Sequence, residues 1–125
     1  MKFAKGVFYV AAVYGLFSLL PLYSMFDYIG RQDPPAITHP QFYYGFIGVA
    51  LAWQIAFLVI ATDPVRFRPL MAVSVVEKFG YVIAVTVLYA QNRMSTPQAL
   101  TTLPDCVLGV LFILAFVRTP AKASA

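Results

Sequence analysis

Four long apolar runs limit what this chain can fold into. They cover Gly6–Met25, Phe42–Ala61, Leu70–Ala90 and Ala99–Val117. Each has about 20 residues, the length that an α-helix needs to cross about 30 Å of hydrocarbon. Lipid offers no partners to backbone N–H and C=O groups, so spanning segments are helices or closed barrels. Continuous rather than alternating apolar runs favour helices.

We therefore predict an all-α integral membrane protein, an antiparallel bundle of four transmembrane helices in one domain over residues 1–125. The predicted spans cover about residues 6–25, 42–62, 69–90 and 97–118. Hydrophobic residues make up 61% of the chain and charged residues 11%, which exceeds the apolar share of ordinary soluble domains. Lys2 and Lys5 precede the first run, as in a signal peptide. That run is too long for one and lacks a cleavage pattern, which indicates an uncleaved span.

The distribution of basic residues predicts the orientation. Those on one side of the predicted membrane are Lys2, Lys5, Arg66, Arg68, Arg118 and Lys122, and those on the other are Arg31 and Arg93. Cytoplasmic loops carry the excess of Lys and Arg, so both termini are predicted to be cytoplasmic. The net charge of +4 therefore indicates topology, and we expect no nucleic-acid partner.

The connections between the runs carry helix boundary signals. The short segment from Asp63 to Pro69 predicts an antiparallel hairpin of the second and third helices. Thr96 followed by Pro97 predicts the N-cap and first turn of the fourth helix, with a bend at Pro104. The alternative is a later start, with a capping box that begins at Thr102. We prefer the earlier start because it gives a helix long enough to span the membrane.

Small residues at four-residue spacing predict helix contacts, since close approach drives helix association in lipid. The rows are Ala11, Gly15 and Ser18 in the first helix, Gly48, Ala52 and Ala56 with nearby Gly45 in the second, and Gly80 and Ala84 in the third. Such rows are common in multi-span proteins. They indicate a compact bundle and do not indicate a ligand.

A polar cluster inside the membrane is the main candidate site. Glu77 lies about 12 Å along the third helix from its cytoplasmic end, and Gln54 lies at about the same depth on the second helix. Tyr81 shares the Glu77 face, Lys78 is adjacent, and Tyr14 of the first helix has a compatible depth. These five residues would bind the head group of a lipophilic molecule, such as a quinone or a lipid, or Glu77 would carry a proton.

A structural interpretation competes with this one. Lys78 would extend toward the cytoplasmic surface, and Glu77 would pair with Lys78, Arg66 or Tyr81. Gln54 also lies about 200° around its helix from the row of Gly48, so the two cannot meet the same neighbour.

A second candidate pocket lies toward the outer surface. Asp105, Asp27, His39 and Tyr43, together with Tyr23, would line it. Asp105 and Asp27 are alternatively helix-capping or loop residues, and His39 is alternatively a plain loop residue. The single cysteine, Cys106, and the single histidine exclude an internal disulfide and fall short of a zinc ligand set. We therefore predict no metal site, and no cofactor is indicated.

Several segments resemble a small group of bacterial membrane proteins. They are His39–Phe46, Ala52-Trp53-Gln54, Asp63-Pro64, Arg66–Pro69 and Glu77-Lys78. In size and span pattern the chain is similar to the DoxX-like four-helix superfamily. The resemblance implies a four-helix bundle in a bacterial inner membrane, where such relatives are linked to quinone or sulfur redox chemistry. Small multidrug exporters also have four spans, but their glutamate in the first helix has no counterpart before Asp27.

These observations leave three functional hypotheses. One is a bundle that binds a lipophilic small molecule at Glu77, and the second is a structural subunit or homo-oligomer whose polar residues lock helices together. Proton-coupled transport ranks third. The sequence pairs no nucleophile with a base, so it predicts no catalytic residue.

Overall fold

The computed structural model describes residues 2–121, which form helices joined by turns and no β-strand. The elements are α1 Lys2–Leu19, the 3₁₀-helix η1 Leu20–Ser24, α2 Phe26–Gln32, α3 Pro40–Thr62, α4 Arg68–Ala90, α5 Thr96–Leu100 and α6 Leu103–Arg118. Lys122, one of the basic residues in the topology prediction, lies outside the described residues.

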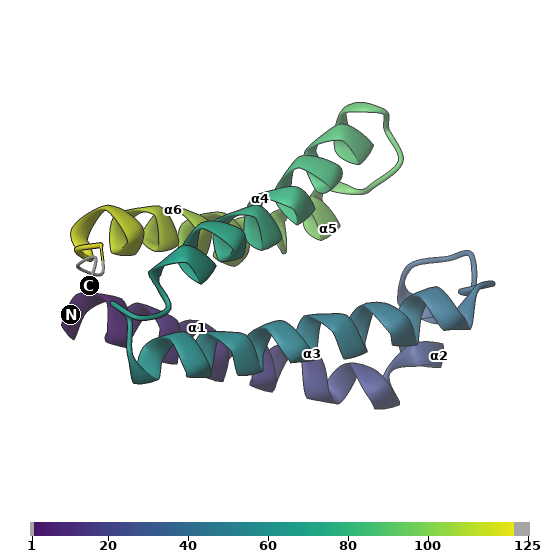
Figure 1. Cartoon of the computed structure of the whole chain (residues 1–125). Coiled ribbons are helices and arrows are strands. Elements are labelled where there is room, and N and C mark those ends of the chain that lie inside the picture. The colour runs from purple at the N-terminus through teal and green to yellow at the C-terminus, as the bar shows by residue number, and fades with distance from the viewer. Residues whose placement is uncertain (1, 122–125) are drawn as a thin grey trace.

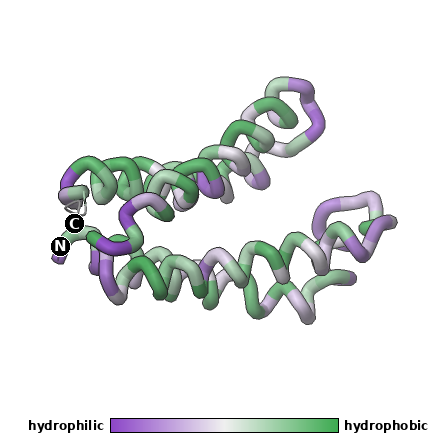
Figure 2. The backbone as a smooth tube through the Cα atoms, viewed as in Figure 1, coloured by the Kyte–Doolittle hydropathy of each residue, from purple (hydrophilic) through white to green (hydrophobic). Residues whose placement is uncertain are grey.

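Four helical segments are long and apolar enough to cross a membrane. They are Lys2–Ser24, Pro40–Thr62, Arg68–Ala90 and Thr96–Arg118, each of 23 residues. Large apolar side chains point outward, among them Phe17, which is 79% exposed, and Val117, which is 70% exposed. Figure 2 shows apolar residues along most of each helix and hydrophilic ones mainly at the turns. Lipid tolerates such a surface and water does not. The prediction of an all-α, four-span membrane protein is confirmed.

The four spans are arranged as two antiparallel helix pairs that diverge like a V (Figure 1). α1 packs along α3, and α4 packs along α6, whereas α3 and α4 make few contacts beyond the turn that joins them. The second and third helices are joined by the predicted short turn, but they diverge instead of packing along each other. The reason is that the buried face of α3, which includes Gln54 and Phe57, meets α1.

Aromatic side chains hold the two pairs together at the narrow end of the V. Phe8 of α1, Phe57 of α3 and Phe112 of α6 are fully buried. The rings of Phe8 and Phe112 stack with centroids 4.4 Å apart, and Phe57 meets Phe112 edge-on at 5.0 Å. Such contacts give close packing, which is what stabilises helix association in lipid.

Arginines reinforce the same end. The Nε of Arg68 donates to the carbonyl oxygens of Thr119, at 2.7 Å, and Phe116, at 3.2 Å. These carbonyls belong to the C-terminal end of α6, where helical partners run out and a cation is favourable. Arg118 lies over the ring of Phe3, with 4.5 Å from Cζ to the centroid, and so joins the end of α6 to the start of α1.

Only one of the predicted small-residue rows makes contacts within the chain. Ala11 and Gly15 of α1 are buried, although Ser18 is exposed. On α3 the prediction that the row contacts another helix of the chain is wrong. Gly48 and Ala52 are exposed, and a Cβ on Gly48 would meet no atom within 4 Å. Among residues 2–121 nothing covers Gly48 or Ala52, because α1 packs against the Gln54 side of α3. Gly80 and Ala84 of α4 are exposed as well.

The fourth span begins early, as preferred, but its cap and its shape differ from the prediction. Ser95, not Thr96, is the N-cap, because its side chain accepts from the Gln98 amide in a full capping box. Thr102 makes no side-chain cap. Instead of a bend at Pro104, the span is interrupted after α5, since Pro104 has no N–H to donate to the carbonyl of Leu100.

Candidate intramembrane binding site

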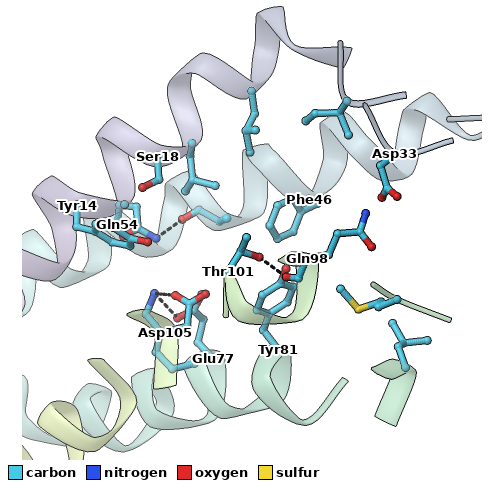
Figure 3. A pocket seen from close by; sticks show the side chains of 18 of the residues that line it. Tyr14, Ser18, Asp33, Phe46, Gln54, Glu77, Tyr81, Gln98, Thr101 and Asp105 are labelled. Atoms are coloured by element: carbon cyan, nitrogen blue, oxygen red, sulfur yellow. Dashed lines mark hydrogen bonds and ion pairs between the residues drawn. The ribbon is translucent and has the colours of Figure 1, made fainter. Parts of the chain in front are cut away.

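A cleft of about 730 Å³ lies between the two helix pairs, on the open side of the V. One wall comes from α1 and α3 and includes Tyr14, Ser18 and Gln54. The facing wall comes from α4, α5 and α6 and includes Glu77 and Tyr81, as Figure 3 shows. Both walls carry polar residues at the level of Gln54 and Glu77. Apolar residues, among them Leu19, Leu22, Phe46 and Leu88, also line the cleft.

A charged cluster forms the polar part of the α4–α6 wall. Lys78 Nζ lies 3.0 Å from Asp105 Oδ1 and 3.8 Å from Glu77 Oε2. Lys78 is only 5% exposed, and its Nζ lies 5.4 Å from the ring centroid of Phe57. Lys78 follows the first residue of α4 by ten positions, or about 15 Å, which places the cluster near the middle of the span. A charge at that depth requires a partner, and Asp105 supplies it.

This geometry overturns the structural interpretation of Lys78. The side chain does not extend to the membrane surface; it is buried and bonded to Asp105. Arg66 is exposed and lies over the ring of Phe67, away from Glu77. Glu77 Oε2 pairs with Lys78 at 3.8 Å, one of the partners that interpretation predicted, and no hydrogen bond joins Glu77 to Tyr81 among the described residues. The reason is that α6 packs along α4 and brings Asp105, 27 positions away, within reach.

Gln54 is the polar centre of the opposite wall. Its side chain is 2% exposed, and its Nε2 donates to the carbonyl of Ala50 at 2.9 Å. Its Oε1 has no hydrogen-bond partner and lies against Gly15, in the space that a Cβ on residue 15 would fill. Gly15 is therefore the residue that lets the amide fit between α1 and α3.

Buried oxygens without hydrogen bonds mark the cleft. Among the described residues three such side-chain atoms occur: Gln54 Oε1, Glu77 Oε2 and Thr102 Oγ1. The first two belong to residues that line the cleft. Buried polar atoms normally have partners. Gln54 Oε1 is packed against Gly15 and Glu77 Oε2 lies 3.8 Å from Lys78 Nζ, so the two oxygens mark the polar level of the cleft and leave its hydrogen bonding incomplete.

The five residues of the predicted inner site all line this cleft: Tyr14, Gln54, Glu77, Lys78 and Tyr81. Asp105, which was assigned to the outer pocket, joins them instead. The other members of the outer pocket do not line the cleft. Asp27 and His39 are exposed, with His39 edge-on to Phe42, and Tyr43 donates to the carbonyl of Leu22.

Sequence reasoning missed several polar residues at the wide end of the cleft. They are Asp33, Arg93, Gln98 and Thr101. Asp33 follows α2, Arg93 lies in the turn after α4, and the other two lie in or next to α5. Each falls in or beside a loop, where the sequence does not show which way a side chain points. Their one shared signal is that they lie on the side of the membrane opposite the termini.

Fold and site together define a multi-pass α-helical membrane protein with a polar cleft in its interior. Comparison with models of known families, with curated proteins and with solved structures returns no significant match to this chain. The resemblance to DoxX-like proteins stays a prediction.

Proposed function

We propose that the chain binds a lipophilic small molecule, with an apolar body and a polar head group, in the cleft between its two helix pairs. The volume of about 730 Å³ falls in the usual range for small-molecule sites. The apolar side chains that line the cleft suit a hydrocarbon or ring system, and the cluster of Glu77, Lys78 and Asp105 suits a head group. A quinone and a lipid are the two classes that the sequence suggests.

The observation that carries this proposal is a partly unsatisfied polar cluster at mid-membrane depth that faces a cleft. Ionisable residues inside a membrane are costly, and those retained usually serve a function. A purely structural pair would need only Lys78 and Asp105, which already bond at 3.0 Å. Glu77 adds a second carboxylate beside the one ammonium, at 3.8 Å, and neither Glu77 Oε2 nor Gln54 Oε1 accepts a hydrogen bond from the described residues.

The direct test replaces Glu77 by Gln and measures binding of a quinone and phospholipid panel to the purified protein by native mass spectrometry. We expect at least a tenfold loss of affinity for the molecule that the unchanged protein retains. Asp63→Asn is the matched control, because it removes the same charge from an exposed turn outside the cleft. Equal binding by both variants and the unchanged protein would refute the proposal.

We further propose that the protein resides in a bacterial inner membrane with both termini cytoplasmic, as a DoxX-like protein would. The support is the excess of Lys and Arg on the side of the termini. Single cysteines introduced at Val65 and Pro120, in a Cys106→Ala background, should react with an impermeant thiol reagent only after the cells are opened. A cysteine at Asp33 should react in intact cells with a permeable outer membrane. Labelling of positions 65 and 120 on opposite sides would contradict this topology.

A structural role as a homo-oligomer subunit is the second candidate, favoured by the exposed row of small residues on α3. Gly48 and Ala52 face away from the rest of the chain, and small exposed residues are where helices approach each other in lipid. Gly48→Ile should then reduce the mass of the detergent-purified particle, while Gly6→Ile, on an equally open glycine of α1, should not. A particle of monomer mass before any mutation would dismiss this role.

A further inference from the structure

The charges that face the cleft do not cancel. Three acids, Asp33, Glu77 and Asp105, and two bases, Lys78 and Arg93, line it. Within the mid-membrane cluster the imbalance is the same, because Lys78 faces both Glu77 and Asp105. Lys78 is the closer to Asp105, at 3.0 Å against 3.8 Å. Glu77 is therefore the more weakly paired of the two acids.

Glu77 can also accept hydrogen bonds from a ligand. Its side chain is 21% exposed and lines the cleft, and its Oε2 has no hydrogen-bond donor among the described residues. An ionised carboxylate only accepts hydrogen bonds, so a head group that donates them suits this wall of the cleft.

Aromatic rings in the cleft also favour a cationic head group. Tyr14, Phe46 and Tyr81 all line the cleft, and the last two stack across α3 and α4 with centroids 6.3 Å apart. Aromatic rings attract cations through their negative faces, and more strongly where water is scarce. An anionic head group would meet both the excess carboxylate and these rings unfavourably.

We infer that the cleft takes a lipophilic amine, whose ammonium head donates hydrogen bonds to Glu77 and whose apolar tail lies along Leu19, Leu22 and Leu88. This inference rests on the proposed function and narrows it to one head-group chemistry. The same ammonium group occurs in free alkylamines and in phosphatidylethanolamine, so the shared chemistry is a primary ammonium on an apolar chain.

The test compares probes that share one tail. Decylamine, decanol and decanoate are titrated at neutral pH into the full chain in detergent, and bound molecules are counted by native mass spectrometry. We expect decylamine to bind at least tenfold more tightly than decanol, and decanoate to bind least. Decyltrimethylammonium, which carries the charge without N–H donors, should bind between decylamine and decanol.

Variants of Glu77 test whether this residue causes the preference for decylamine over decanol. Glu77→Gln should bring decylamine within about threefold of decanol, whereas Glu77→Asp should keep the preference and Asp63→Asn should leave it unchanged. Helical circular dichroism and an unaltered elution volume confirm that each variant is folded. If Glu77→Gln fails this check, the Glu77→Asp result and the order of the probes on the unchanged protein decide alone.

The possible outcomes distinguish a failure of the amine preference from a failure of the proposed function on which it rests. Equal binding of decylamine and decanol would overturn the amine preference and keep a lipophilic site, and tighter binding of decanoate would do the same. Absence of binding by all probes would overturn both. Retention of phosphatidylethanolamine over phosphatidylglycerol from a mixed micelle, lost in Glu77→Gln, would support the amine preference with a membrane lipid as its source.

Discussion

Two residues, Lys78 and Gly15, show how one side chain, or the lack of one, shapes the interior of this protein. Lys78 is buried at mid-span, where its ammonium lies 3.0 Å from Asp105 and 3.8 Å from Glu77. Gly15 carries no side chain, and that absence gives the Gln54 amide its place between α1 and α3. In each case one small change would remove a partner or fill a space, and the effect on stability follows directly.

Lys78→Met tests the charged cluster. The substitution leaves Asp105 and Glu77 as two carboxylates without a counter-ion, so we expect a loss of about 3 kcal/mol in the free energy of unfolding. The measurement is helical circular dichroism during titration with sodium dodecyl sulfate in mixed micelles. The double variant Lys78→Met with Asp105→Leu should recover part of the loss. A loss no larger than that of Lys5→Met, on an exposed lysine, would argue against a structural ion pair.

Gly15→Ala tests the contact with Gln54. A Cβ at position 15 would collide with the amide of Gln54, so we expect a loss of about 1–3 kcal/mol in the free energy of unfolding by overpacking. Gln54→Ala in the same chain should remove most of that penalty. Gly6→Ala is the control on the same helix, because nothing lies within 4 Å of its added Cβ. Equal effects of both glycine changes would show that the contact is absent.

At the scale of the elements, proline and the caps decide where helices begin and stop. α1 tightens into the 3₁₀-helix η1 where Pro21 enters the chain, and the fourth span breaks where Pro104 does. At both positions an α-helical hydrogen bond is missing because proline has no N–H to donate. The break at Pro104 also shapes the cleft. It places Asp105 in the first turn of α6, where the helix dipole favours an acid, and within reach of Lys78.

Ser95→Ala tests the start of the fourth span. Because the Ser95 side chain caps the Gln98 amide, its removal should cost about 1 kcal/mol in the free energy of unfolding. Thr96→Ala should cost less, since Thr96 is not the cap and only shares an exposed hydrogen bond with Tyr89. Sodium dodecyl sulfate titration again gives the values. A larger loss for Thr96→Ala would move the cap to that residue.

The whole molecule is held at one end and open at the other. Three phenylalanines and Arg118 join the helix pairs near the termini, whereas few contacts cross between the pairs elsewhere. This asymmetry leaves the cleft as a gap in the bundle that lipid or a ligand would fill. The narrow end therefore governs how widely the cleft opens.

Phe112→Ala tests this control of shape. In water-soluble cores the change costs about 3–5 kcal/mol, and we expect the lower end here because lipid removes most of the transfer term. Spin labels at Ile29 and Arg93, on the two sides of the wide end, should show a broader distance distribution in the variant. Phe17→Ala, at a residue 79% exposed, should change neither stability nor the distribution. An unchanged distance distribution in Phe112→Ala would locate the control elsewhere.

Sequence alone determined the four helical spans and placed Glu77 and Gln54 at nearly the same depth, with Tyr14 at a compatible one and Tyr81 on the Glu77 face. The reason is that lipid demands about 20 apolar residues per helix, and the rise and turn per residue are fixed. Only the tertiary structure decided which helices pair. That choice turned the Gly48 row outward and brought Asp105 to Lys78. Periodicity gives a residue its depth and its angle on a helix, but the neighbour that it meets depends on long-range packing, which in lipid no pattern of hydrophobicity encodes.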